Sequence, residues 1–173
     1  MNFPPPLCLV RRMMNNILKK AYGLYKKFDT CNPSRLCEYL GINLLCSDLP
    51  PVTDGIYFTA QGNQIILVNQ NISREKARYV VAHELGHALL HPNQNYMFMA
   101  GKTFMKTGRY EIEADYFCVS LLLCEIIKNN KIENMTSLEL SKMAGIPEKV
   151  VSMWMKNTNL KELKEIFAKK EED

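Results

Sequence analysis

The chain has 173 residues, of which 47% are hydrophobic and 23% charged, and its formal net charge is +4. This length and composition predict one compact domain, with room for a small appended lobe. No stretch approaches the roughly 18 uninterrupted apolar residues of a membrane span. The arginines near the start follow a short apolar run instead of preceding it, which is the wrong order for a secretory signal. We therefore expect a cytoplasmic protein, and the modest charge does not require a nucleic-acid partner.

The six cysteines form no Cys-x-x-Cys pair, so a thiolate metal site is not expected. Cys37, Cys118 and Cys124 have apolar neighbours and are predicted to be reduced residues of the core. A disulfide framework is disfavoured in a chain of this length.

The first third of the chain predicts two helices and a strand. Residues 1–10 are predicted to be an irregular arm, and the apolar residues of 11–28 recur at intervals of three and four, which indicates an amphipathic helix. Asn32-Pro33 supplies an N-cap and a proline at the first helical position of a short helix that ends at Gly41. Residues 42–46 are predicted to form a brief strand.

The middle of the chain predicts a β-hairpin followed directly by a helix. Residues 55–60 and 64–69 are rich in strand-forming side chains, and the turn signal Gln61-Gly62-Asn63 separates them. The second strand is apolar on both faces and is expected to be central or covered. Ser73 can cap the next helix, which Pro92 stops.

This helix contains His83-Glu84-Leu85-Gly86-His87. Two histidines four apart project from one helix face, one turn apart, and can hold one Zn²⁺ at about 2.0–2.1 Å each. Glu84 beside them can accept a proton from a water on the metal, acting as general base and not as ligand. The simpler alternative is that these histidines are surface or packing residues.

A catalytic zinc site needs a third protein ligand. His91 lies two turns beyond His83, about 12 Å along the axis, which is too far for both to reach a metal held by His87. We expect His91 to bond the helix end instead.

A second, mostly covered helix is predicted for residues 110–128, after a long loop over 92–109 that flanks the substrate cleft. Glu111 and Asp115 share one face of this helix, while Glu113 points about 200° away. We assign Glu111 to the metal and Asp115 to a ligating histidine as its orienting partner. Two alternatives stay open, because acids favour any helix N-terminus and periodicity does not exclude Glu113 as the ligand.

The same region offers candidates for an oxyanion donor. Tyr96, Arg109 and Tyr110 are near enough in the chain, although each is more often a surface or packing residue.

The tail resembles a helix-turn-helix. It comprises a helix over residues 137–144, a break at Gly145-Ile146-Pro147 and a helix through Trp154, and a last charged segment over 160–173 is expected to be helical. The second helix contains no arginine that could read bases. A packing or partner-docking role is therefore favoured over DNA binding.

Taken together, these segments resemble the ImmA/IrrE family of metallo-endopeptidases over about residues 30–125, with an extension to residue 157 left open. The resemblance implies a small α+β zincin-like domain, in which a short hairpin packs on the His-Glu-x-x-His helix beside N-terminal and C-terminal helices. It also implies Zn²⁺ held by His83, His87 and Glu111. One departure is visible, because the family often ends its second metal-site helix in Leu-Leu-Met-Pro and this chain has Leu121-Leu122-Leu123-Cys124. The motifs that carry the resemblance are Gly55-Ile56-Tyr57, Ile66-Leu67-Val68-Asn69, residues 81–91 and residues 111–117.

Family members are cytoplasmic, and many are encoded on phages or mobile elements and cut a helix-turn-helix repressor. We therefore expect a zinc metallopeptidase domain over 1–135 and a helix-turn-helix-like segment over 136–173 packed on it. The expected partner is a protein substrate, namely a repressor of a mobile element or a stress regulon. The alternative is a DNA-binding or protein-binding regulator that uses the C-terminal segment, with zinc as a structural or sensing ion. The intact Glu84 argues against an inactive sensor.

Overall fold

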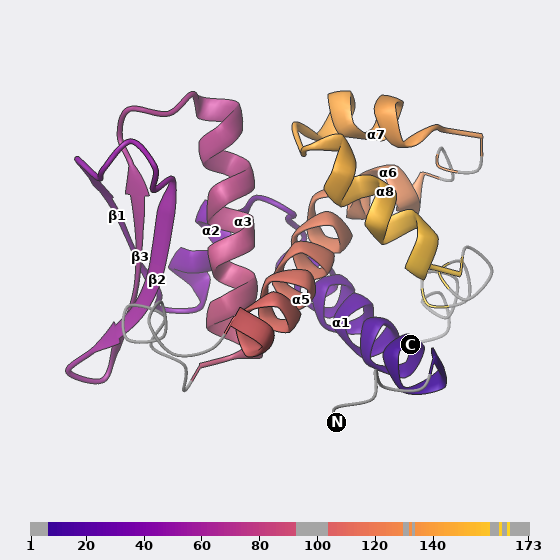
Figure 1. Ribbon diagram of the computed structural model, residues 1–173, viewed down its shortest axis with the longest axis horizontal. Helices are drawn as coiled ribbons and strands as arrows, with labels where there is room; N and C mark the ends of the chain where they lie inside the picture. Colours follow the sequence, from indigo (N-terminus) through magenta and orange to yellow (C-terminus); the bar gives the residue numbers. More distant parts are fainter. Residues whose placement is uncertain are drawn as a thin grey trace.

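The computed structural model describes residues 7–92, 104–129, 132, 134–159, 163 and 166. Its helices and small mixed sheet confirm the α+β class. Figure 1 shows the sheet on one side, α7 and α8 on the other, and α3 and α5 between them. In chain order the elements are α1 (Leu7–Phe28), α2 (Pro33–Tyr39), β1 (Asn43–Ser47), β2 (Gly55–Ala60), β3 (Asn63–Asn69), α3 (Arg74–Leu90), α5 (Phe104–Leu122), α6 (Cys124–Lys128), α7 (Ser137–Ala144) and α8 (Glu148–Asn157).

The described strands form one sheet in the order β1-β3-β2. β2 and β3 are antiparallel, and Gln61 and Gly62 connect them with φ values of 51° and 81°. Two positive φ values define the tight turn that matches strand twist, so the predicted hairpin is confirmed. β1 lies parallel to β3 on its other side, which makes β3 the central strand.

Two helices begin earlier than predicted. α1 begins at Leu7, so the predicted arm over residues 1–10 is partly helical. α5 begins at Phe104, inside the predicted loop over 92–109, of which residues 93–103 lie outside the described part of the chain.

The single helix expected over 110–128 is divided at Leu123 into α5 and α6. At the break, the Cys124 thiol donates to the Ser120 carbonyl oxygen at 3.1 Å. In a continuous helix this oxygen would accept from the Cys124 backbone N–H. Of the expected charged helix over 160–173, the structure describes only residues 163 and 166, and both are helical.

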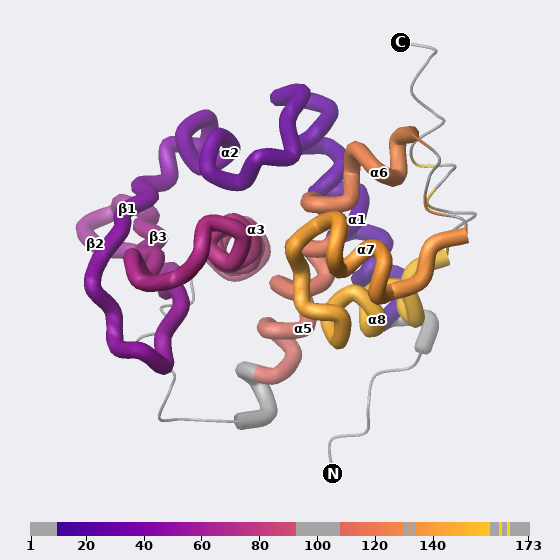
Figure 2. Tube along the Cα trace, turned by 90° about the horizontal axis from the view of Figure 1, so that it is seen from above, coloured from indigo at the N-terminus to yellow at the C-terminus, as the bar shows by residue number. Residues whose placement is uncertain are grey.

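α3 is the central helix, with the sheet on one side and α5 on the other (Figure 2). Two glycines allow this close packing. A Cβ atom on Gly86 would lie 3.1 Å from both the Cα and the carbonyl oxygen of Ala114 in α5, and a Cβ on Gly55 would collide with Val80 Cγ1 of α3. Because any larger residue would push these elements apart, the two glycines fix α3 against both neighbours.

The α7–α8 pair packs on α5. Trp154 of α8 is fully buried and donates from Nε1 to Ser120 Oγ at 2.9 Å. The hydroxyl oxygens of Tyr116 and Thr158 lie 2.7 Å apart. The division into 1–135 and 136–173 stays a prediction, although α8 shares a buried interface with the helix that carries Glu111. None of the described helices has the length and apolar character needed to cross a membrane.

Candidate metal centre

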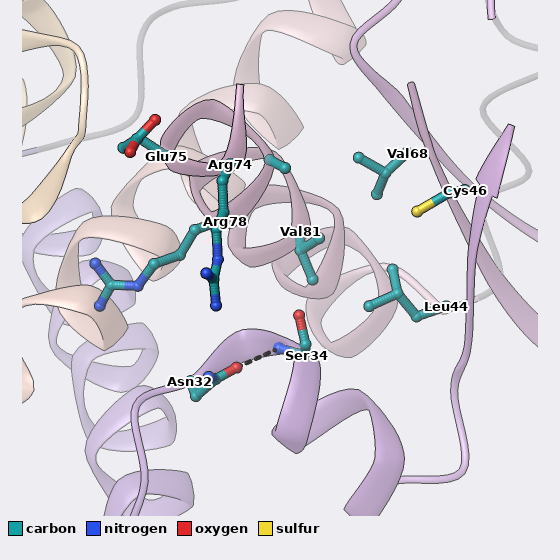
Figure 3. Close-up of a pocket in the computed structure, with 10 residues that line it drawn as sticks. Asn32, Ser34, Leu44, Cys46, Val68, Arg74, Glu75, Arg78 and Val81 are labelled. Atoms are coloured by element: carbon teal, nitrogen blue, oxygen red, sulfur yellow. Dashed lines mark hydrogen bonds between the residues drawn. The ribbon is translucent and has the colours of Figure 1, made fainter. Parts of the chain in front are cut away.

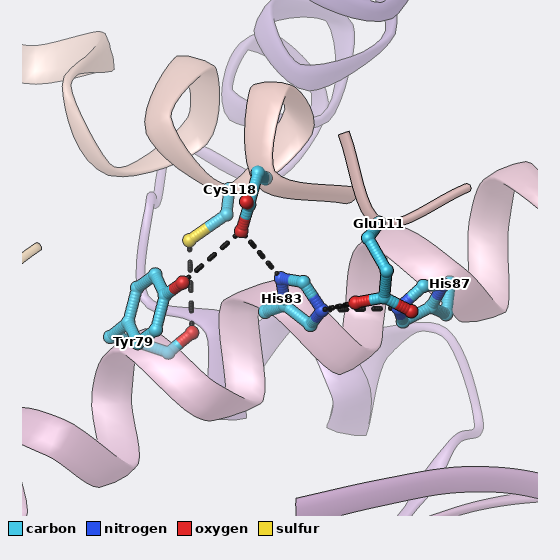
Figure 4. Close-up of polar contacts among 6 residues, drawn as sticks. Tyr79, His83, His87, Glu111 and Cys118 are labelled. Atoms are coloured by element: carbon cyan, nitrogen blue, oxygen red, sulfur yellow. Dashed lines mark hydrogen bonds and ion pairs between the residues drawn. The ribbon is translucent and has the colours of Figure 1, made fainter. Parts of the chain in front are cut away.

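Three predicted ligands meet where α3 faces α5. His83 and His87 project from α3, and the Glu111 carboxylate from α5 lies between the two imidazoles (Figure 4). Glu111 Oε2 lies 3.2 Å from His83 Nε2, and its Oε1 lies 3.4 Å from His87 Nε2. The two Nε2 atoms are 3.1 Å apart.

These distances fit a small tetrahedral ion. Bonds of about 2.0–2.1 Å in tetrahedral geometry separate neighbouring donors by about 3.3–3.4 Å. The three observed separations of 3.1, 3.2 and 3.4 Å are close to that value. Two imidazoles and one carboxylate also match a donor set that leaves the fourth position of a zinc ion open. The residues present therefore fit a metal of the kind that the sequence predicts.

Asp115 holds the His83 ring from behind. Its Oδ1 lies 2.9 Å from His83 Nδ1, so Nδ1 carries the proton and Nε2 points toward Glu111. The Tyr79 hydroxyl donates to the same Oδ1 at 3.1 Å. Sequence reasoning missed Tyr79, although its position four residues before His83 on the same helix face was the available signal.

The electrostatics of the cluster favour a positive charge at its centre. Burial opposes protonation of His83, but its hydrogen bonds to Asp115 and Glu111 and the charge of Glu84 outweigh burial and raise the pKa of His83 to about 10. Burial also opposes ionisation of Glu111, yet hydrogen bonds with both imidazoles hold the pKa of its carboxyl well below the usual range. Carboxylates converging on two imidazoles form an anionic pocket, and a bound cation would compensate its charge.

Glu84 lies beside this cluster and lines a cleft of about 390 Å³. Burial raises the pKa of its carboxyl, while the charges of His83 and His87 and a hydrogen bond from the Tyr57 backbone act in the opposite direction. The other walls of the cleft come from the loop before β2, from α3 and from α5, and the lining includes Glu111 and Asp115. A water or a peptide carbonyl in this cleft would have access to both Glu84 and the predicted ligands.

Glu113, the open alternative for the third ligand, belongs to a separate cluster. It accepts a hydrogen bond from Arg109 Nε at 2.6 Å, and its other oxygen lies 3.4 Å from His91 Nε2. The His91 ring packs against Tyr110, with centroids 4.4 Å apart. As expected, His91 bonds the helix end, because its backbone N–H donates to the His87 carbonyl at 2.9 Å.

This cluster also bears on the oxyanion candidates. Arg109 bonds Glu113 and Tyr110 packs on His91, and neither residue is among those that line the cleft with Glu84. Tyr96 lies outside the described residues. Cys37, Cys118 and Cys124 are buried free thiols, as predicted.

A second cavity, of about 530 Å³, lies between α2, the sheet and the first half of α3 (Figure 3). Arg74 and Arg78 reach over it, and Arg78 donates to the Ala144 carbonyl at 3.2 Å. Its lining contains one carboxylate, Glu75, and no histidine. The larger cavity therefore lacks the histidine and paired carboxylates of a catalytic metal site, whereas His83, Glu84 and Glu111 line the smaller cleft.

The chain also matches known proteins. The family model described as the IrrE N-terminal-like domain, of peptidase family M78, matches residues 37–151, and the chain belongs to this family. The match confirms the resemblance and suggests a metallopeptidase. The chain is 34% identical over 131 residues to "Uncharacterized immunity region protein 2" of Bacillus phage phi105, covering 75% of this chain and 83% of that protein. It is 25% identical over 117 residues to "Metallopeptidase ImmA" of Bacillus subtilis (strain 168), covering 67% and 68%.

Proposed function

We propose that this chain is a zinc-dependent endopeptidase with a zincin-like arrangement of its hairpin and metal-site helices. One observation carries the proposal. The donor atoms of His83, His87 and Glu111 lie at tetrahedral spacing, with the Glu84 carboxylate beside them in an open cleft. A site that served structure alone would not need an open approach or a buried carboxylate next to the metal.

The mechanism assigns one task to each of the chain's own residues. Bound zinc would bring the pKa of a water molecule toward about 7 and polarise the scissile carbonyl. Glu84 accepts the proton of the attacking water and then donates it to the leaving amine. Burial raises the pKa of Glu84, and a pKa closer to neutrality suits both of these proton transfers. Asp115 keeps the His83 ring in the orientation and tautomer that a ligand needs.

The edge of β2 offers a place for an extended substrate. Among the described strands, β2 pairs with β3 alone. The Asn69 N–H donates to the Asp54 carbonyl, so these two residues form a hydrogen-bonded pair of the antiparallel ladder. Because such pairs alternate along the strands, the N–H and C=O groups of Gly55 and Tyr57 point away from β3. The Tyr57 backbone already reaches Glu84, so this edge runs past the proposed base. A peptide that adds to β2 would place its carbonyls near Glu84.

We infer that the substrate is a helix-turn-helix repressor of a mobile element or stress regulon, cut in the cytoplasm. Two relatives support this inference. One is described as an immunity region protein of a phage, and another as a metallopeptidase. A small cleft of this kind also suits one regulatory target better than bulk digestion, because contacts away from the scissile bond can add to its selectivity.

The rival proposal is a regulator that binds DNA or protein through α7 and α8, with zinc as a structural or sensing ion. The αL cap at Gly145 gives this pair a helix-turn-helix-like form. However, α8 buries Val151 and Trp154 against the rest of the protein, which leaves Lys149 and Lys156 as its exposed cations. Two lysines give little basis for reading bases, so the packing role is better supported.

The test combines cleavage with metal content. Purified enzyme is incubated with the helix-turn-helix repressor encoded beside its gene, fragments are mapped by mass spectrometry, and zinc is measured by elemental analysis. Glu84→Gln should retain about one zinc per chain and lose cleavage by a factor on the order of 10² or more. Glu111→Gln should lose much of the metal, while the matched variant Glu113→Gln should keep it. An enzyme that leaves the repressor intact but binds operator DNA specifically would support the rival proposal.

A further inference from the structure

The loop between β1 and β2 forms one wall of the cleft that contains Glu84. Val52, Thr53 and Asp54 from this loop line the cleft together with Gly55, the first residue of β2. Val52 is 94% exposed. A valine held so far out of the core buries nothing in the free protein, so its apolar surface is available to a substrate in the cleft.

Asn69 fastens this loop from inside the protein. Its side chain is 4% exposed, and Nδ2 donates to the carbonyls of Leu49, Pro50 and Thr53 at 3.2, 3.4 and 2.9 Å. Its Oδ1 accepts from the Asn71 N–H at 3.0 Å, and its own N–H donates to the Asp54 carbonyl at 2.8 Å. The two Nδ2 hydrogens thus serve three carbonyls of the wall, with one hydrogen shared, and the backbone N–H serves a fourth. An apolar residue of the same size would keep only the backbone bond.

Other contacts remove the remaining freedom of the loop. Thr53 N–H closes a turn onto the Pro50 carbonyl at 2.8 Å, and Lys76 of α3 pairs with Asp54 at 2.7 Å. Pro50 and Pro51 have fixed φ angles. A loop fastened in this way loses little entropy when a substrate binds against it.

The end of the loop is also fixed against the proposed base. Gly55 follows Asp54 directly, and a Cβ atom on Gly55 would lie 3.4 Å from Glu84 Cγ. Only two residues, Thr53 and Asp54, separate Val52 from Gly55, and the Asn69 contacts hold this segment in place. A side chain that touches Val52 belongs to a substrate residue near the scissile bond.

We propose that Val52 selects an apolar substrate side chain near the scissile bond, and that Asn69 is the positioning residue that holds Val52 in place. This inference rests on the proposed peptidase function and names the substrate feature that the cleft prefers. An apolar contact of this size discriminates between substrates by about tenfold or somewhat more.

The first experiment changes Val52 to aspartate. Zinc-loaded wild type, Val52→Asp and the control Leu138→Asp are incubated with a peptide library prepared from a digested proteome, and cut sites are mapped by mass spectrometry. Leu138 is an exposed apolar residue in the first turn of α7, outside the cleft, where an acid suits the helix N-terminus. In Val52→Asp, the preference for an apolar residue at one substrate position should fall by about tenfold, while the zinc content of this variant stays unchanged. The cut-site profile of Leu138→Asp should match that of the wild type.

The outcomes separate the two proposals. An unchanged cut-site profile in Val52→Asp would overturn the selection role and leave the peptidase function intact. A zinc-loaded wild type that cuts neither the library nor the repressor would overturn the peptidase function, and this inference with it.

The second experiment tests Asn69 as the positioning residue. Asn69→Asp keeps the shape but directs a carboxylate at three carbonyls, so the loop should detach. Hydrogen exchange of the amides of residues 49 and 52–54 should become faster, since Pro50 and Pro51 have no amide hydrogen. KM should rise more than kcat falls, with zinc retained. The control is Asn71→Ala, which removes one exposed bond, to Asp48 at 2.8 Å, without adding a charge. A folded Asn69→Asp variant with protected loop amides and an unchanged KM would overturn the positioning role. If Asn69→Asp does not fold, the Val52→Asp experiment still tests the proposal, because Val52 is largely exposed and its substitution does not disturb the core.

Discussion

The two faces of α5 use polar residues in opposite ways. On the face toward α3, Glu111 and Asp115 are charged, and their side chains are 46% and 24% exposed to the cleft. On the face toward α8, Tyr116 and Ser120 are neutral and completely buried, and each has hydrogen-bond partners within the protein. One helix thus carries both the candidate metal centre and a closed packing interface.

The difference lies in what completes each set of bonds. The hydroxyl and indole groups between α5 and α8 satisfy one another, so the interface needs no ligand and contributes to stability. The carboxylates and imidazoles between α3 and α5 leave an anionic centre, which a cation would complete. We therefore expect substitutions on the first face to change metal binding and those on the second face to change the free energy of unfolding.

The largest effect is expected from removing a ligand. His87→Ala deletes one of the two imidazoles, so bound zinc should fall well below one per chain. Cleavage should fall by a factor on the order of 10³, beyond the 10- to 100-fold loss typical of partners outside the ligand shell. The control is His91→Ala, one turn further along α3, where the side chain faces Glu113. Elemental analysis measures the zinc content of both variants after identical purification. Equal zinc in the two would refute the assignment of His87 as a ligand.

Trp154→Ala should act on the other face. It removes a fully buried indole, and such truncations lower the free energy of unfolding by about 3–5 kcal/mol. Urea denaturation followed by far-ultraviolet circular dichroism measures the loss, with Met143→Ala, 53% exposed on α7, as control. The native fraction should still bind zinc normally. A loss of metal without a loss of stability would show that the two faces are not separate in function.

Asp115→Asn should weaken metal binding without emptying the site. The amide keeps the size of the carboxylate but no longer supports the His83 ring with a negative charge, and such losses cost about 10- to 100-fold in metal affinity. Competition with a chromogenic chelator measures the affinity. An unchanged affinity would mean that Asp115 only packs beside His83.

Tyr79→Phe should have the smallest effect. It removes one hydrogen bond to Asp115 and leaves the bond between Asp115 and His83 in place. A single hydrogen bond contributes about 0.5–1.5 kcal/mol, so zinc affinity should fall by about two- to tenfold. The same chelator assay applies, and a loss as large as that of Asp115→Asn would assign the main positioning role to the tyrosine.

The sequence predicted the features that local signals determine. Asn32 and Ser73 cap their helices as expected, because each side chain accepts N–H groups only two or three residues away. The turn at Gln61-Gly62 follows from the same kind of short-range preference. The spacing of His83, Glu84 and His87 on one helix likewise follows from helix geometry alone.

Features that depend on distant partners were harder to predict. Nothing local in β1 says that it pairs with β3, because the pairing joins Asn43 to Ile65 across the whole of β2. The cluster of Glu113 with Arg109 and His91 depends on how α3 meets α5, and helix periodicity gives only the direction of each side chain.

The break at Leu123 did have a signal in the family pattern. The proline of Leu-Leu-Met-Pro corresponds to Cys124, the first residue of α6, and proline favours the first position of a helix. Cys124 carries no such signal, so the sequence of this chain does not mark the start of α6.

The contact of Gly86 with Ala114 has a consequence for the choice of ion. Because Gly86 has no side chain, α3 and α5 approach closely enough for His87 Nε2 and Glu111 Oε1 to lie 3.4 Å apart, a separation that suits a small ion. Ca²⁺ needs six to eight oxygen ligands at about 2.3–2.6 Å, and two imidazoles and one carboxylate at this spacing cannot provide them. We therefore expect the glycine between the histidines to favour zinc over larger, oxygen-seeking cations.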